Sequence, residues 1–486
     1  MRKILFIATF LLLATVSCQR ARDVKHLYII ATNDVHANIY AMPQLATLVD
    51  EYEAKGEVLV VDSGDRVSGN AFVDDGSEPG VPMIELMNAV GYDYVGFGNH
   101  EFDKGPEALG RMIGVSTAQW LSANMISYNE AVAVAPYAIY EYEGVKLAFV
   151  GVVDTDDNGH PLGQESVYAD FEFRSDAQAA FDAVLEADTK ADFVVVLSHM
   201  GLTLDRLFIG MQPNCQWVAG GHSHDIVNED IMGVRLTQNG KNLGVVTVAD
   251  IEISNGAIVG VSYSQEVIDD ELAKESVTAI VARIKSQNEE LNAVEGRALG
   301  QFTHAGVANL TVEAVADYPY ADFTPELSFY HYGGVRLSSI LPGDITRGDI
   351  FNNDPFNSEI FIGELTTEQI KEFILRKYNN WGDDGRVDKE SHYAYFRSDV
   401  PYQIIVGDSP AELPDAVDIC IDLEPERSYR VAMGDYMAKK YIDEAIVESQ
   451  LRPSGVFVRE ALMHYVHSHS EGLVPDNEVH QIEIKK

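Results

Sequence analysis

Residues 94–105 read YVGFGNHEFDKG, and this stretch is the clearest indication of how the N-terminal part of the chain folds. A short apolar run leads into a glycine-bounded turn that presents Asn99, His100, Glu101 and Asp103 within five residues. An apolar run of this length, bounded by turn residues, is typical of a buried strand. The polar side chains therefore follow the carboxyl end of a strand, which is where open α/β sheets hold their ligands.

Four further clusters of the same construction occur within the first 224 residues. They are Asp34-Val35-His36 after LYIIAT, Gly64-Asp65 after VLVV, Ser198-His199 after FVVVL, and Gly221-His222-Ser223-His224 after WVAG. Since all five follow predicted strands, we expect their side chains to converge at one edge of the sheet. Carboxylate and imidazole groups suit zinc, manganese or iron, and one Asp can bridge two ions. The pattern therefore predicts a site for a pair of divalent metals.

After its N-terminal segment, the chain divides into three parts. Residues 24–266 alternate strand-like and helix-like stretches, which indicates a layered α/β domain. Residues 267–297 carry apolar side chains at three- to four-residue multiples, and we expect a single linker helix there. Residues 298–486 mix strands and helices without metal-type clusters, and we interpret them as a smaller second domain.

The N-terminus has the composition of an export signal. Arg2 and Lys3 precede the apolar stretch 4–16, so we expect residues 1–17 to be removed as a signal peptide. The residues before Cys18 resemble a bacterial lipobox, in which the Cys becomes lipidated. Cleavage and release without a lipid is the alternative. Lipidation and cleavage without a lipid both predict a protein in the periplasm or on the outer cell surface.

The charge of the chain excludes one class of function. It carries 35 basic and 76 acidic residues, for a net charge of −41. Nucleic-acid polymers and anionic lipid surfaces repel such a chain. A small anionic substrate is compatible with it only where metals or arginines invert the local field.

The order of the five clusters resembles that of the calcineurin-like metallophosphoesterases. The GNHEFDKG form and a second domain after a linker resemble, more narrowly, the two-domain bacterial 5′-nucleotidase family, which includes UDP-sugar hydrolases and 2′,3′-cyclic phosphodiesterases. The resemblance implies an N-terminal four-layer α/β/β/α sandwich and an α+β C-terminal substrate domain. It also implies an extracytoplasmic hydrolase that attacks a phosphoester with a hydroxide held between two divalent metal ions, zinc, manganese or similar.

The resemblance assigns roles to individual residues of the first domain. It implies one metal site of Asp34, His36, Asp65 and His224, and a second of Asp65, Asn99, His199 and His222. It implies that His100 and Asp103 form the catalytic pair, in which the carboxylate orients the imidazole against the leaving group. A hydrogen-bonded core or loop role is the usual explanation of one His. Recurrence at successive strand ends argues against that explanation here.

In the second domain the resemblance is weaker. Gly333-Gly334-Val335-Arg336 matches the glycine-rich Arg motif of the family, and Pro355-Phe356 matches its base-stacking element. The implied substrate-binding residues are Gly333, Gly334, Arg336 as a phosphate clamp, and Phe356 as a stacking ring. The alternatives are a surface Arg after a turn and an ordinary core Phe.

Two departures from the family bear on the substrate. Residues 303–310, THAGVANL, contain no Arg, and residues 437–445, MAKKYIDEA, replace an aromatic loop. We therefore expect one phosphate clamp and one base-stacking ring to be missing. The main hypothesis is a 5′-nucleotidase-type phosphomonoesterase. The alternatives are a phosphoesterase of the same fold acting on sugar phosphates or cyclic nucleotides, and a catalytically idle surface lipoprotein that binds a ligand.

Overall fold

The computed structural model describes residues 24–156, 159–163, 165–268, 272–379, 396–408, 414–479 and 482–485. The predicted signal peptide, residues 1–17, and the predicted lipidation site, Cys18, lie outside this part of the chain. Among the described residues, no helix has both the length and the apolar character needed to cross a membrane.

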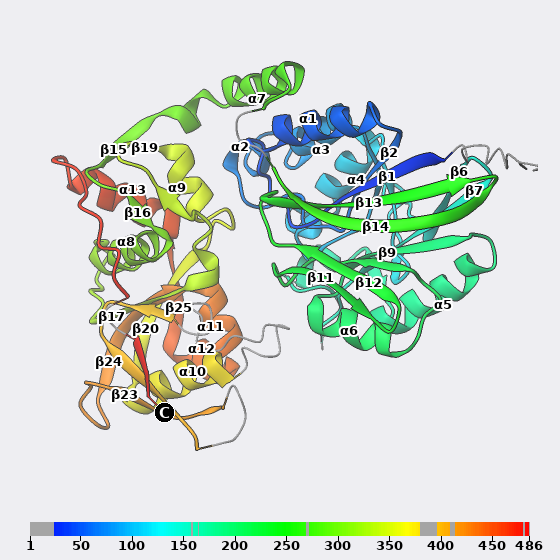
Figure 1. Cartoon of the computed structure of the whole chain (residues 1–486). Coiled ribbons are helices and arrows are strands. Elements are labelled where there is room, and N and C mark those ends of the chain that lie inside the picture. The colour runs from blue at the N-terminus through cyan, green and yellow to red at the C-terminus, as the bar shows by residue number, and fades with distance from the viewer. Residues whose placement is uncertain are drawn as a thin grey trace, which may run out of the picture.

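Two six-stranded sheets pack face to face in the N-terminal domain (Figure 1). In sheet order, the first contains β14 (Ala257–Val267), β13 (Val245–Ser254), β1 (Lys25–Thr32), β2 (Glu57–Asp62), β3 (Tyr92–Val95) and β4 (Gln119–Trp120). The second contains β11 (Ile226–Ile231), β12 (Val234–Asn239), β10 (Trp217–Ala219), β9 (Phe193–His199), β7 (Val145–Val153) and β6 (Tyr137–Tyr142). Ile29, Val61 and Leu197 are among the buried side chains that meet between the sheets.

Helices cover the outer face of each sheet, which gives the predicted four layers. The helices α1 (Met42–Glu53), α3 (Val81–Val90) and α4 (Gly105–Val115) cover the first sheet, and α5 (Asp176–Asp188) and α6 (Leu202–Gly210) cover the second. In β1, Ile30 packs toward the helices while its neighbour Ile29 packs between the sheets. A strand buried on both faces reads as an unbroken apolar run, which explains the runs before the polar clusters.

Strand direction brings the polar clusters together. The strands β1, β2 and β3 are parallel in the first sheet, as are β9 and β10 in the second, so their carboxyl ends meet at one edge. A hairpin with Asn255 and Gly256 at its turn joins β13 to β14. Both central residues have positive φ, 55° at Asn255 and 74° at Gly256, as a type I′ turn requires.

The prediction of one linker helix over residues 267–297 is wrong in extent. The structure has α7 (Glu275–Gln287), a 3₁₀ turn over Glu289–Asn292, and then β15 (Val294–Ala298). Asn288 ends α7 with non-helical dihedrals, φ −125° and ψ 58°. Leu291 remains buried in the 3₁₀ turn, so the apolar spacing continues past the end of the helix. The sequence pattern therefore could not reveal the break.

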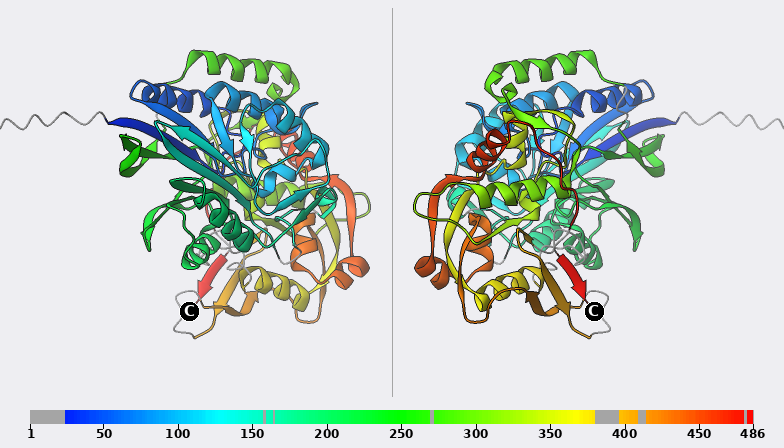
Figure 2. Two further views of the ribbon diagram at one scale, coloured as in Figure 1. Left: turned by 90° about the vertical axis from the view of Figure 1, so that its right-hand side faces the viewer. Right: turned by 90° about the vertical axis from the view of Figure 1, so that its left-hand side faces the viewer.

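The C-terminal domain is built on a mixed five-stranded sheet (Figure 2). Its order is β21 (Phe396–Ser398), β17 (Leu327–His331), β24 (Ser428–Gly434), β20 (Glu359–Thr366) and β25 (Leu451–Phe457). The helices α10 (Thr367–Asn379) and α11 (Asp435–Tyr441) share one apolar core with the sheet, and α8 (His304–Asp317), α9 (Arg347–Asn353) and α13 (Val458–Ser468) share another. This is the α+β architecture expected of the second domain.

The two domains touch at a short helix, α2 (Ala71–Asp74), which follows the loop after β2 (Figure 1). The Ala71 N–H donates to Asn352 Oδ1 of α9 at 2.6 Å. Asp75 forms an ion pair with Arg459 of α13 at 3.0 Å, and Arg459 also donates to the Asp354 carbonyl at 2.7 Å. The second domain is thus fixed beside the edge where the polar clusters converge.

Candidate metal centre and active site

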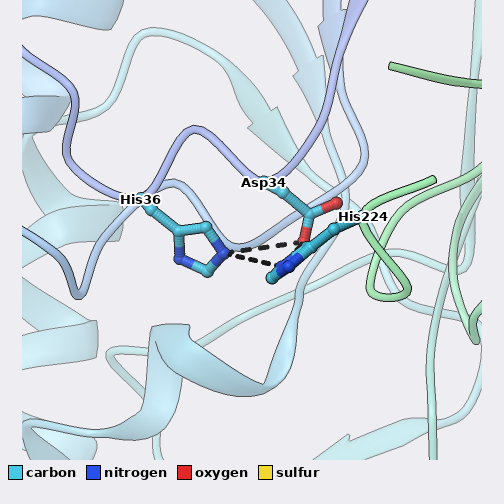
Figure 3. A group of neighbouring side chains, drawn as sticks. All are labelled: Asp34, His36 and His224. Carbon is cyan, nitrogen blue, oxygen red and sulfur yellow. Dashed lines mark hydrogen bonds and ion pairs between the residues drawn. The ribbon is translucent and has the colours of Figure 1, made fainter. Parts of the chain in front are cut away.

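The first predicted ligand set forms a compact cluster. Asp34, His36 and His224 each offer a ligand atom, and these atoms lie within 4.8 Å of one another. Figure 3 shows both imidazoles turned toward the Asp34 carboxylate. His36 Nε2 lies 3.0 Å from His224 Nε2, and Asp34 Oδ1 lies 3.8 Å and 3.3 Å from these two atoms. Ring nitrogens that face each other at this distance need a shared proton or cation between them.

The second predicted set lies next to the first and is joined to it by Asp65. Ligand atoms of Asp65, His199 and His222 lie within 4.8 Å of one another, and Asn99 Oδ1 is 3.2 Å from His222 Nδ1. Asp65 also groups with His36 of the first set. His199 Nε2 is 3.1 Å from Asp65 Oδ2. This nitrogen is buried without a well-formed hydrogen bond among the described residues.

These donors fit a pair of divalent cations. Carboxylate, imidazole and amide oxygen groups are ligands for zinc, manganese and iron. Burial raises the pKa of Asp65, but His199 and His100 outweigh it and hold that pKa well below its usual range. Asp65 is therefore a carboxylate at neutral pH, in the form that binds cations. The structure brings all seven predicted ligands together, while their role in binding metal stays a prediction.

The loops that carry the donors have an unusual backbone. Five of the seven predicted ligands have left-handed φ angles: 50° at Asp34, 44° at His36, 56° at Asp65, 77° at His222 and 61° at His224. Asp and His are among the residues that adopt this region most readily, yet each instance still costs about 1–3 kcal/mol. Neighbouring loops hold them in place, since the Asp34 N–H donates to the Gly64 carbonyl at 3.0 Å and the His36 N–H to the Asp65 carbonyl at 2.9 Å.

The buried carboxylate of Glu101 links two of these loops through hydrogen bonds. Its carboxylate accepts hydrogen bonds from the backbone N–H groups of Asp65 at 2.9 Å, Arg66 at 2.9 Å and Gly98 at 2.6 Å. The Arg66 guanidinium is fully buried and lies 3.0 Å from Asp62 and 3.8 Å from Glu101. Arg66 could not be identified from the sequence, because only the fold shows that this charged side chain is buried beside the predicted ligands.

We expect Glu101→Gln to destabilise the protein by about 2–4 kcal/mol. A side-chain amide cannot accept three N–H bonds as a carboxylate does, and Arg66 would lose a buried countercharge. Chemical unfolding followed by circular dichroism measures the change. Glu107→Gln is the matched control, because its side chain is 92% exposed and should change stability by less than about 0.5 kcal/mol. Equal stability of the two variants would contradict the role assigned to Glu101.

The predicted catalytic pair is formed in the structure. His100 Nδ1 donates to Asp103 Oδ2 at 2.7 Å, which leaves Nε2 directed into the site, 3.9 Å from Asp65 Oδ2. Burial lowers the pKa of His100, but Asp103 and Asp65 outweigh it and raise the pKa to about 9. The imidazole is thus set up to hold a proton beside the converging donors. Its catalytic role stays a prediction.

Arg336 and Phe356 reach the same place from the second domain. Arg336 Nη2 lies 3.3 Å from His100 Nε2 and 3.5 Å from His36 Nδ1, so this guanidinium does not lie on an open surface. Phe356 is 40% exposed, which rules out a core role. Its ring centre lies 5.9 Å from that of His100 and 5.4 Å from the Arg336 guanidinium. Both side chains therefore face the first domain across the candidate site.

The two predicted glycines have a clear packing role. A Cβ added at Gly333 would lie 2.7 Å from the His331 ring, and one added at Gly334 would lie 3.3 Å from the Tyr330 ring. These close approaches explain why the segment before Arg336 contains glycine. Contact of Gly333 and Gly334 with a substrate stays a prediction.

Two residues near this segment were missed by the sequence argument. His304, in the stretch that lacks Arg, contacts the Val335 carbonyl through Nε2 at 2.7 Å and so supports the loop of Arg336. Tyr436 is 38% exposed, and its ring lies 5.1 Å from that of His331. The only sequence signal for Tyr436 is its place directly after a Gly-Asp pair at the end of an apolar run.

Comparison with known families agrees with this architecture. Residues 27–225 match the calcineurin-like phosphoesterase family, and residues 281–443 match the 5′-nucleotidase C-terminal domain. The first match spans all seven predicted metal ligands, and the second contains Arg336 and Phe356.

Individual relatives show the same two-domain relationship. The chain is 25% identical to protein UshA of Yersinia enterocolitica over 524 residues, which cover 91% of each protein. It is 24% identical over 470 residues to the trifunctional nucleotide phosphoesterase YfkN of Bacillus subtilis, covering 85% of this chain and only 32% of that protein. The structure of a 5′-nucleotidase precursor from Thermus thermophilus has the same fold, with a TM-score of 0.78 at 18% identity, covering 94% of this chain and 99% of that one. The chain therefore belongs to the two-domain 5′-nucleotidase family of calcineurin-like metallophosphoesterases, whose members are metal-dependent phosphoric ester hydrolases.

Proposed function

We propose that this protein is an extracytoplasmic 5′-nucleotidase-type phosphomonoesterase that uses two divalent metal ions. The observation that carries the proposal is the position of Asp65, which groups with His36 and His100 on one side and with His199 and His222 on the other, while Arg336 contacts His36 and His100. Arg336 lies against His100, whose pKa is raised, despite burial, to about 9 by Asp103 and Asp65, so two cationic groups meet at this point of a chain whose net charge is −41. A phosphoryl group is the kind of anion that such a point would bind.

Three residues of the chain have distinct roles in the proposed hydrolysis. Divalent cations bound here would supply activation of water and neutralisation of phosphoryl charge. Arg336 binds the phosphoryl oxygens, for which the planar guanidinium offers paired N–H donors. His100 holds a proton at Nε2 and delivers it to the leaving oxygen. Asp103 holds the opposite ring nitrogen, which fixes both the tautomer and the direction of the imidazole.

Two exposed rings support a nucleotide as the substrate. Phe356 faces the site, and Tyr436 lies close to the glycine-rich segment, because its ring contacts that of His331, which packs against Gly333. Stacking of a base on one aromatic side chain contributes about 1–3 kcal/mol. Tyr436 is therefore our candidate for the second stacking ring. Two of the relatives, a nucleotide phosphoesterase and a 5′-nucleotidase precursor, support the same substrate class.

A substrate panel tests the proposal and its alternatives. The fold alone does not choose the ester, so the panel contains nucleoside 5′-monophosphates, a UDP-sugar, a 2′,3′-cyclic nucleotide and sugar phosphates. We expect phosphate release to be fastest from nucleoside monophosphates, to stop after chelation, and to return when zinc or manganese is added. Faster turnover of another ester would favour the same-fold alternative. No turnover of any ester by the metal-loaded protein would favour the idle ligand-binding lipoprotein.

The extracytoplasmic location is tested separately. Residues 1–18 carry this part of the proposal. Mass spectrometry of the protein from fractionated cells should find a mature N-terminus at Cys18 carrying a lipid. An unprocessed chain in the cytoplasmic fraction would contradict both export and lipidation.

Arg336→Ala should raise KM for a nucleoside monophosphate by about 10- to 100-fold. Removal of a charged hydrogen-bonding partner weakens binding by roughly 1.5–3 kcal/mol. Steady-state kinetics measures this change. The matched control is Arg427→Ala, because Arg427 is 43% exposed and pairs with Glu326 within the second domain. Unchanged rates in Arg336→Ala on every ester would show that the second domain binds the substrate elsewhere.

A further inference from the structure

Asp103 receives two hydrogen bonds on the same oxygen atom. His100 Nδ1 donates to Asp103 Oδ2 at 2.7 Å, and Ser68 Oγ donates to the same Oδ2 at 2.6 Å. Ser68 is only 2% exposed and comes from the loop between β2 and α2. The predicted catalytic pair is therefore part of a hydrogen-bonded series of three side chains. The third, Ser68, lies outside every cluster identified from the sequence.

The backbone at Ser68 is held in a costly conformation. Its φ is 65°, in the left-handed region. The buried carboxylate of Asp74 accepts hydrogen bonds from the backbone N–H groups of Ser68 at 3.0 Å, Gly69 at 2.8 Å and Asn70 at 2.8 Å. Such strain persists where the surrounding structure holds the residue in place, and it concentrates at functional sites. At this position, it directs the Ser68 hydroxyl at Asp103.

We propose that Ser68 is a positioning residue for the His100–Asp103 pair. Its hydroxyl fixes the rotamer of the Asp103 carboxylate, and the carboxylate in turn fixes the imidazole that delivers a proton to the leaving oxygen. The Asp103 side chain is 23% exposed, so water can compete for it once the hydroxyl is removed. This inference rests on the proposed phosphomonoesterase function and adds to it a residue that acts through another.

The dependence of rate on the leaving group distinguishes positioning from a general structural role. A nucleoside 5′-monophosphate releases an alkoxide that needs the proton from His100, whereas p-nitrophenyl phosphate releases a stable phenolate that does not. We expect Ser68→Ala to lower kcat for the nucleoside monophosphate by about 10- to 100-fold, with KM unchanged. For p-nitrophenyl phosphate we expect less than about a threefold loss of kcat.

A second variant and a control protect the test against misfolding. Ser68→Gly also lacks the hydroxyl, but glycine adopts the left-handed region without strain, so it should show the same leaving-group dependence in a stable protein. Ser116→Ala removes a hydroxyl that, within the described part of the chain, donates to the Ala118 carbonyl at 3.2 Å, and should leave both rates unchanged. Equal losses on both esters, or no loss on either, would overturn the proposal.

A spectroscopic measurement separates this inference from the proposed function. In protein labelled with ¹⁵N at histidine, the Nδ1 proton of His100 should give a downfield resonance that Ser68→Ala shifts or broadens and Ser116→Ala leaves in place. An unchanged resonance in Ser68→Ala would overturn the positioning role. If the wild type hydrolyses neither ester while the resonance responds to Ser68→Ala, the proposed function fails and the geometric link to Asp103 stands.

Discussion

Asp65→Asn should lower kcat/KM for a nucleoside monophosphate by about three orders of magnitude. Asp65 shares a ligand cluster with His36 on one side and with His199 and His222 on the other. A neutral amide at this point removes the one negative charge that both cations would share. The loss of several kcal/mol of charge stabilisation by a metal corresponds to roughly a 10³-fold change in rate.

Metal content provides a second readout for the same variant. We expect wild type to retain two divalent ions per chain after gel filtration, and Asp65→Asn to retain one or none, as measured by atomic emission. The control is Asp50→Asn, which removes an exposed partner of Lys274 and should change neither quantity. If Asp65→Asn keeps two ions and full activity, Asp65 does not bridge two metals.

His100→Gln should lower kcat for a nucleoside monophosphate by about 10²- to 10⁴-fold, the usual contribution of a positioned general acid. His100 Nε2 is directed toward Arg336 and Asp65, where the phosphoester would lie, while Nδ1 is held by Asp103. Glutamine keeps most of the volume of the side chain but cannot transfer a proton. The loss for p-nitrophenyl phosphate should be much smaller, since its leaving group needs no proton.

The matched control for this variant is His467→Gln. His467 is 56% exposed and pairs with Glu295 at 2.6 Å, away from the candidate site. The rates of His467→Gln on the nucleoside monophosphate and on p-nitrophenyl phosphate should equal those of wild type. A similar fall on both esters in His100→Gln, or none on either, would remove His100 from its role as the proton donor.

The arrangement of the first domain could be predicted because its signals are local. Each strand that leads to the site is buried on both faces, so an unbroken apolar run marks it, and the first turn residue marks its end. Asp34, Asp65 and His199 follow such runs, and parallel strands then carry them to one edge. The chemistry of the donors added the expectation of two cations.

The support beneath the site could not be predicted in the same way. Ser68 and Asp103 are 35 positions apart, and Arg66 lies beside Glu101 only because two loops cross. No spacing in the sequence records such meetings. The break after α7 was hidden for a different reason, since Leu291 is buried by a 3₁₀ turn just as it would be by a helix.

The second domain was harder to predict because its motifs are single residues rather than repeated patterns. The sequence leaves a surface role open for Arg336 and a core role open for Phe356, and only the docking of the domain at α2 shows that both face the first domain. Tyr436 shows the opposite case. Its position in the sequence departs from the family pattern, and its exposure near His331 became visible only in three dimensions.

The left-handed backbone at five of the predicted ligands has an evolutionary consequence. Glycine at any of them would relieve backbone strain of about 1 kcal/mol or more, so a lineage that no longer needed the predicted ligands could gain stability by replacing them. Most proteins drift close to their stability threshold, where such gains are tolerated freely. A chain that carries all five of these side chains still bears the backbone strain, as expected of a protein in which the predicted site remains in use.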